Sequence, residues 1–143
     1  MHLWISCGLH PAETLTMTMQ ITFGEGDRVD ALYKGKTIST DQEGPLPEPF
    51  ELFLVSIGTC SGYYVAKFCR SRDIPTEGVR LEMRRILFPE SKMIERIEID
   101  VHLPEDFPER YRTAVVRAAK QCTVKKHLDQ PPAVDVQAVV DGS

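Results

Sequence analysis

The chain has 143 residues and a formal net charge of -4, with 42% hydrophobic and 27% charged residues. Such a chain is long enough to form one domain with its own core, and its composition is that of a soluble globular protein. The acidic balance disfavours a nucleic-acid-binding function, because proteins of that class usually carry a basic face.

The four cysteines are too few for a disulfide-dense secreted scaffold. No C-x-x-C pair indicates a zinc knuckle or a thioredoxin motif, so we treat the cysteines as thiols. The N-terminus lacks the basic segment of a signal peptide, and no run approaches the roughly 18 apolar residues of a membrane span. We therefore expect a cytoplasmic protein with no membrane partner.

The first third of the chain is predicted to form three strands. Residues 1–16 match neither periodicity, and we expect them to be an arm or extension ahead of a single domain over 17–143. Apolar residues alternate over 17–23, which is typical of a half-buried strand. The segments 29–33 and 37–40 read as two further short strands joined by a tight turn.

The stretch 51–72 is the longest run without proline and is predicted to be the central helix. Its apolar residues lie on almost every side, so we expect other parts of the fold to wrap it. Gly58 and Gly62 remove side-chain bulk on either side of Cys60. Two interpretations follow: another group approaches the cysteine closely, or two helices cross at small residues.

The second half of the chain is predicted to contain a hairpin, a helix and a final strand. Segments 79–83 and 97–103 alternate apolar and charged residues, as in two antiparallel strands with one wet face. A second helix is predicted over 104–122 with Asp106 as its cap, and a last strand over 134–140.

The predicted order is therefore βββ-α-ββ-α-β, which favours an α+β fold with mainly antiparallel sheets and a central buried helix. Two nearly all-apolar helices present more surface than one small sheet covers. We expect an obligate homodimer that buries the surplus.

Spacing separates the cysteines into different classes. Cys60 and Cys69 are nine residues apart, about 900° of helical rotation and roughly 13 Å of rise, so they cannot pair. Cys69 is predicted to be a small buried apolar residue. Cys60 and Cys122 lie on the inner faces of the two predicted helices, where they are either a reactive pair or two structural thiols. Three basic residues close to Cys122 would ease its ionisation: Lys125, Lys126 and His127.

Two segments, 49–60 (PFELFLVSIGTC) and 121–128 (QCTVKKHL), resemble the OsmC/Ohr family of osmotically inducible protein C and organic hydroperoxide resistance proteins. The resemblance extends over roughly residues 20–140. It implies an intertwined α+β homodimer with two active sites at its interface. It also implies reduction of organic hydroperoxides by thiols, with no metal or other cofactor.

The resemblance also implies roles for individual residues. Cys60 would be the peroxidatic thiolate that becomes a sulfenic acid, and Cys122 the resolving thiol that forms a disulfide with it, later reduced by an external dithiol. Arg28 is the nearest match to the arginine that activates the thiolate, and a surface turn arginine is its alternative interpretation.

The carboxylate that orients this arginine directly follows a proline in the hydroperoxide-resistance branch, and here that position is Phe50. Glu51 stands one residue later, where it is also a first-turn helix acid. This departure indicates an OsmC-like subgroup.

Other functions remain open from the sequence. The same pocket would suit a non-catalytic binding protein for a small apolar or electrophilic molecule, and the thiol pair would suit a redox sensor. A metal site made of Cys60, Cys122 and His127 is disfavoured, because no second pair of ligands lies at close spacing. Tyr63 and Tyr64 either line a pocket or belong to the core.

Overall fold

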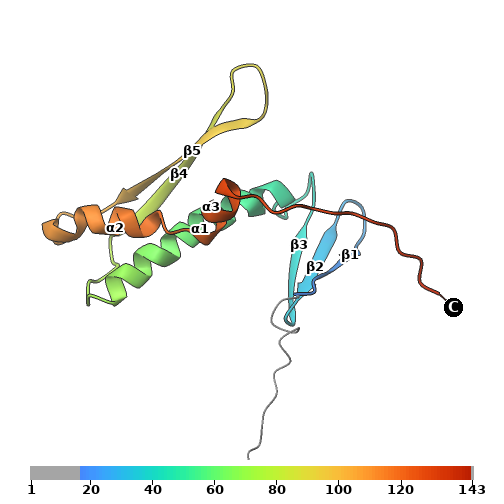
Figure 1. Cartoon of the computed structure of the whole chain (residues 1–143), viewed down its shortest axis with the longest axis horizontal. Helices are drawn as coiled ribbons and strands as arrows, with labels where there is room; N and C mark the ends of the chain where they lie inside the picture. The colour runs from blue at the N-terminus through green and yellow to red at the C-terminus, as the bar shows by residue number, and fades with distance from the viewer. Residues whose placement is uncertain (1–16, 143) are drawn as a thin grey trace, which may run out of the picture. The chain divides into compact units, whose positions relative to one another are not determined.

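The computed structural model describes residues 17–142, so the predicted arm and Cys7 lie outside the described residues. The chain divides into two compact units, Met1–Leu52 and Phe53–Ser143. The predicted domain boundaries stay predictions. The elements shown in Figure 1 are, in chain order, β1 (Gln20–Phe23), β2 (Val29–Tyr33), β3 (Lys36–Thr40), α1 (Pro49–Arg70), β4 (Arg80–Leu87), β5 (Ile94–His102), the 3-10 turn η1 (Glu109–Tyr111), α2 (Arg112–Ala119) and α3 (Thr123–Asp129).

The first unit contains an antiparallel meander in the order β1-β2-β3. Lys34 and Gly35 connect β2 to β3, with φ angles of 48° and 70°, and Tyr33 pairs with Lys36 across the turn. Two consecutive positive φ angles in a two-residue loop match the twist of a hairpin. The three predicted strands of this region are confirmed.

The expectation that the first strand is half buried is wrong for this chain. All four residues of β1 are exposed; Ile21 and Phe23 keep 54% and 87% of their surface. The described residues of the first unit leave this row of alternating apolar side chains largely open.

The central helix α1 begins with a well-formed cap. Glu48 precedes the helix, and its backbone N–H donates to Glu51 Oε2 at 3.0 Å. Pro49 is the first helical residue, where a missing N–H is tolerated. The Glu51 carboxylate thus satisfies a free donor of the first turn, as the acidic half of a capping box does.

The end of α1 forms a Schellman motif. Ile74 N–H donates to Cys69 O at 2.9 Å and Asp73 N–H to Arg70 O at 3.3 Å. Asp73 adopts the left-handed conformation, with φ of 53°. This closure turns Ile74 back into the core beside Cys69 and ends the helix.

Only one stripe of α1 is buried, so the expectation of a helix wrapped on all sides is wrong for the single chain. Val55 and Tyr63, on other sides, keep 52% and 53% of their surface. By length and composition alone α1 is long and apolar enough to cross a membrane, a criterion that core helices of soluble proteins also meet. The expectation that no run approaches such a span is therefore wrong. The buried stripe consists of Ile57, Ser61, Val65, Phe68 and Cys69.

The core of the second unit joins α1 to η1, α2 and the hairpin of β4 and β5. Val115 of α2 and Cys69 of α1 are fully buried there, with Phe107 from the connecting loop. Arg72 covers this core at one end, because its guanidinium lies 3.8 Å from the centre of the Phe68 ring.

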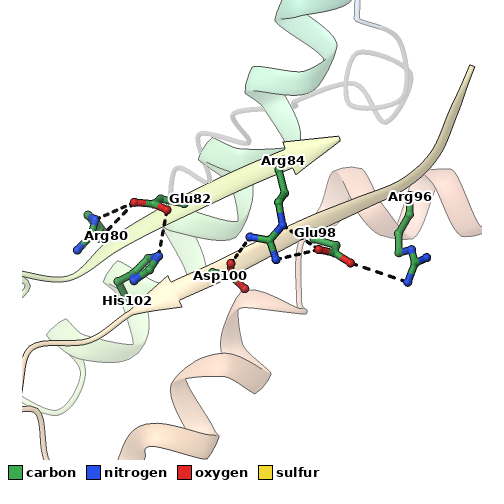
Figure 2. A network of polar contacts seen from close by, with 7 residues as sticks. All are labelled: Arg80, Glu82, Arg84, Arg96, Glu98, Asp100 and His102. Carbon is green, nitrogen blue, oxygen red and sulfur yellow. Dashed lines mark hydrogen bonds and ion pairs between the residues drawn. The ribbon is translucent and has the colours of Figure 1, made fainter. Parts of the chain in front are cut away.

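The antiparallel hairpin of β4 and β5 confirms the predicted pair of strands. Its wet face carries a network of charged side chains (Figure 2). Arg84 lies between Glu98, 2.8 Å from its Nη2, and Asp100, while Glu82 contacts Arg80 and His102. Exposed ion pairs of this kind add little stability each, so the network chiefly keeps this face in solvent.

The single helix predicted over 104–122 is wrong. The chain instead forms η1 and α2, and a separate helix α3 begins after Cys122. Asp106 caps neither η1 nor α2, whose capping positions are Pro108 and Tyr111. The helical apolar pattern continues through this break, which is why periodicity alone missed it.

The strand predicted over 134–140 is also wrong for the described chain, since residues 130–142 form no helix or strand. Val134 and Val136 keep 83% and 92% of their surface. A strand needs a neighbour for its backbone groups, and none of the described residues supplies one.

The Schellman motif leads to a test of local stability. Asp73→Gly removes the cost of a left-handed side-chain-bearing residue and should raise the free energy of unfolding by up to about 1 kcal/mol. Asp73→Val should lower it by about 1 kcal/mol or more, because β-branched residues avoid this conformation. Urea unfolding followed by circular dichroism measures both. Equal stability of the two variants would contradict the left-handed conformation of Asp73 in this motif.

Candidate active site

Cys60 lies in the middle of α1 and is half buried. Three groups hydrogen-bond its sulfur: the backbone N–H groups of Val124 and Thr123, and the thiol of Cys122. The sulfur therefore faces the first turn of α3, and the structure brings the predicted thiol pair together.

The surroundings of Cys60 shift its ionisation in two opposed directions. Burial favours the neutral thiol and would raise the pKa, but the Val124 amide, the Cys122 thiol and the Thr123 amide together outweigh it. The net pKa of Cys60 lies below its ordinary value of 9.0. Donors aimed at a sulfur stabilise the thiolate, which is the nucleophilic form.

Cys122 serves the fold and the thiol pair at once. Its side chain is almost fully buried, with 1% of its surface exposed. The sulfur accepts from Lys125 N–H at 3.3 Å and thereby caps α3, and it lies 3.9 Å from Ile57 O, so its single S–H faces either that carbonyl or the Cys60 sulfur. It is a free thiol, as are Cys60 and Cys69.

The basic residues after Cys122 are engaged along their own helix. Lys125 Nζ lies 3.0 Å from Asp129 Oδ2, and His127 Nδ1 lies 2.8 Å from Thr123 O. Their effect on Cys122 stays a prediction. Within residues 17–142, no three His, Cys, Asp or Glu side chains are grouped to hold a metal ion.

Cys69 behaves as predicted for a core residue. It is fully buried in the cluster around Phe68 and Val115. Burial raises the pKa of its thiol, and the positive charge of Arg72 opposes this only in part. Cys69 is thus an internal reference for an unreactive thiol.

Arg28 belongs to the first unit, on the loop before β2. Its Nε donates to Asp30 Oδ1 at 3.0 Å and its Nη2 to Ser39 Oγ at 3.3 Å, and half of its side chain is exposed. Hydrogen bonds from Ser39 and Arg28 lower the pKa of Asp30. Asp30 is thus the carboxylate that orients this arginine within the unit, and the action of Arg28 on Cys60 stays a prediction.

Glu51 also belongs to the first unit. Its carboxylate caps α1 by accepting from Glu48 N–H, which is the structural role predicted for a first-turn acid. Its part in the reaction site stays a prediction.

The glycines that flank Cys60 are not forced by contacts among the described residues. A Cβ atom at Gly58 would meet Met83 Sδ at 3.8 Å, which is ordinary van der Waals contact, and one at Gly62 would meet nothing within 4 Å. Neither interpretation offered for them is supported within this chain.

A hydroxyl pair beside Cys60 was not found by sequence reasoning. Tyr64 Oη lies 3.0 Å from Thr123 Oγ1 and links α1 to α3. Tyr63 keeps 53% of its surface, so it is not a core residue, and its ring meets that of Tyr64 edge-on. The signal in the sequence was the position of Tyr64, one helical turn after Cys60.

A cavity of about 570 Å³ in the second unit lies elsewhere, at the end of α1. Arg72 and Arg110 line it together with Asp73, Glu77 and Asp106, so its charges are mixed. Neither Cys60 nor Cys122 lines this cavity.

The opposite pKa shifts of two cysteines on one helix provide a pH test. Iodoacetamide reacts with thiolates, so alkylation of Cys60 should reach its half-maximal rate below pH 9.0, and Cys69 should stay unmodified in the folded protein. Peptide mass spectrometry at several pH values measures each cysteine separately. A Cys60 midpoint at or above that of a model thiol would contradict the site described above.

The comparisons with known proteins agree with this architecture. A family model described as OsmC-like protein matches residues 40–137, more than half of the chain. No curated protein sequence matches the chain.

Among solved structures, a Psychrobacter arcticus protein provisionally described as an osmotic stress induced and detoxification response protein is 18% identical, with a TM-score of 0.64 over 78% of this chain and 87% of that one. A protein of unassigned function from Aquifex aeolicus is 18% identical, with a TM-score of 0.63 over 81% and 89%. An OsmC-like protein from Mycoplasma pneumoniae is 12% identical, with a TM-score of 0.62 over 81% and 89%. These likenesses show an α+β fold with antiparallel sheets and a central helix. The chain belongs to the OsmC-like protein family.

Proposed function

We propose that this protein is a thiol-dependent peroxidase that reduces organic hydroperoxides in a detoxification response. The observation that carries the proposal is the surroundings of the Cys60 sulfur, which accepts hydrogen bonds from two backbone amides and from the thiol of a second cysteine. This arrangement stabilises a thiolate and supplies the partner thiol that a disulfide cycle needs. The Psychrobacter arcticus protein of the same fold carries a description as a detoxification response protein.

The first step uses the Cys60 thiolate as a nucleophile. Its sulfur attacks the terminal oxygen of the hydroperoxide, the O–O bond breaks, and the other oxygen leaves with the electron pair as an alkoxide that takes up a proton. The products are an alcohol and Cys60 sulfenic acid. Sulfur is oxidised by two electrons and the peroxide is reduced by two.

The second step uses Cys122. Its sulfur attacks the sulfur of the Cys60 sulfenic acid, its proton and the sulfenic hydroxyl leave as water, and a disulfide forms. Because the two thiols are already neighbours, this step needs little displacement of α3. An external dithiol, which the reducing cytoplasm would supply, then returns both cysteines to thiols.

We also propose that the working form is a homodimer. The exposed apolar residues of β1 and the exposed alternation over 134–140 are surfaces that a second copy would cover. Arg28 is proposed to act on the Cys60 thiolate in this assembly.

Substitution of each cysteine tests the reaction. Cys60→Ser should reduce consumption of cumene hydroperoxide by about 100-fold or more with a dithiol supplied, because the nucleophile is lost. Cys122→Ser should still consume one equivalent and accumulate a sulfenic acid, which dimedone labels. Cys69→Ser is the matched control and should keep the wild-type rate. If wild type and Cys60→Ser consumed the peroxide at one rate, the proposed peroxidase function would be wrong.

Sedimentation equilibrium tests the dimer. At micromolar concentration the mass should be twice that of one chain. Val136→Asp should weaken the dimer, because it places a charge on the apolar side of the alternation. Gln137→Asp adds the same charge on the other side and should weaken it less. A wild-type protein that sediments as a monomer would contradict the assembly.

A further inference from the structure

The hydroxyl pair of Tyr64 and Thr123 adjoins the reactive sulfur. Tyr64 lies four residues after Cys60, so the two side chains occupy neighbouring turns of the same face of α1. Thr123 takes part in both contacts: its Oγ1 lies 3.0 Å from Tyr64 Oη, and its backbone N–H donates to the Cys60 sulfur. The hydrogen bond between the hydroxyls therefore fixes a residue that itself contacts the thiolate.

The helix that carries these amides has few other means of staying in place. It contains seven residues, and none of them is buried. A helix this short is only marginally stable by itself, and its burial is limited to the capping Cys122 and the half-buried Val124. Polar contacts at its first turn add to this, among them the Cys122 sulfur near Ile57 O and the Tyr64 hydroxyl with Thr123.

We propose that Tyr64 is a positioning residue for Cys60. Its hydroxyl holds Thr123, and through it keeps the Thr123 and Val124 amides aimed at the sulfur. Tyr64 does not react with substrate in this account. Without the hydroxyl, the first turn of α3 would move more freely, the amides would contact the sulfur for less of the time, and the thiolate would lose stabilisation.

The charged groups nearby do not replace this contact. On α3, Lys125 is paired with Asp129, and His127 is bonded to the Thr123 carbonyl. The β4 side chain that faces Gly58, two residues before Cys60, is the apolar Met83. The contact between the two hydroxyls is thus the influence on Cys60 ionisation that a single substitution can remove.

Tyr64→Phe tests the proposal because it keeps the ring and removes only the hydroxyl. The alkylation rate of Cys60 by iodoacetamide at pH 7, followed by peptide mass spectrometry, should fall about threefold to tenfold, the range expected when one hydrogen bond is lost. The midpoint of its pH profile should move upward. Thr123→Val should give the same change, Thr123→Ser should restore most of the rate, and the Tyr64→Phe/Thr123→Val double variant should show no further loss.

Tyr63→Phe is the matched control, because it removes the neighbouring hydroxyl, for which no contact with α3 is seen. It should alkylate at the wild-type rate. A Tyr64→Phe rate within twofold of wild type would overturn the proposal, and so would an equal loss in Tyr63→Phe. If Tyr64→Phe does not fold, the Thr123 pair decides: equal rates for Thr123→Val and Thr123→Ser would overturn it.

The purpose of this positioning rests on the proposed peroxidase function, but the test does not, since alkylation needs no peroxide. A loss of alkylation in Tyr64→Phe without any peroxide consumption by wild type would retain the positioning role and reject the peroxidase. Peroxide consumption by wild type with unchanged alkylation in Tyr64→Phe would retain the peroxidase and reject the positioning role.

Discussion

The ionisation of Cys60 depends on hydrogen bonds that its own helix cannot supply. A residue in the middle of α1 has its neighbouring backbone N–H groups already bonded within the helix. The donors come instead from Thr123 and Val124, where the chain starts a new helix and leaves its first N–H groups without intrahelical partners. Burial alone would make Cys60 a poor nucleophile, so these donors decide the sign of its pKa shift.

This constraint explains why the break after α2 matters. If one helix had continued through residue 122, as the apolar pattern indicates, the N–H groups of Thr123 and Val124 would have donated to carbonyls of that helix. The stop at Ala119 and the restart after Cys122 free these groups, and the Cys122 sulfur caps the restarted helix. One cysteine therefore supplies a cap, a contact to α1 and the second thiol of the pair.

Local patterns were sufficient for much of the fold. The strand at 29–33, the central helix and the hairpin of β4 and β5 follow from periodicity and turn residues within short segments. The helix over 104–122 was mispredicted because an apolar stripe does not record where capping interrupts it. The strand over 134–140 was mispredicted because strand formation needs a partner, which the described chain does not supply.

The candidate site likewise contains residues that the sequence could reveal and others that it could not. Helix spacing separated the buried Cys69 from Cys60, and the family resemblance singled out Cys60 and Cys122 as the pair. The amides of Thr123 and Val124 could not be identified, because every residue carries a backbone N–H and only the folded path aims it. The Tyr64 contact was missed for a related reason, since its partner lies on a helix that the pattern did not predict.

Peptide mapping after one equivalent of an alkyl hydroperoxide tests the central claim most directly. We expect a disulfide between Cys60 and Cys122 as the main product, with Cys69 still a free thiol. Recovery of both Cys60 and Cys122 as unmodified thiols, or oxidation of Cys69 in preference to them, would contradict it.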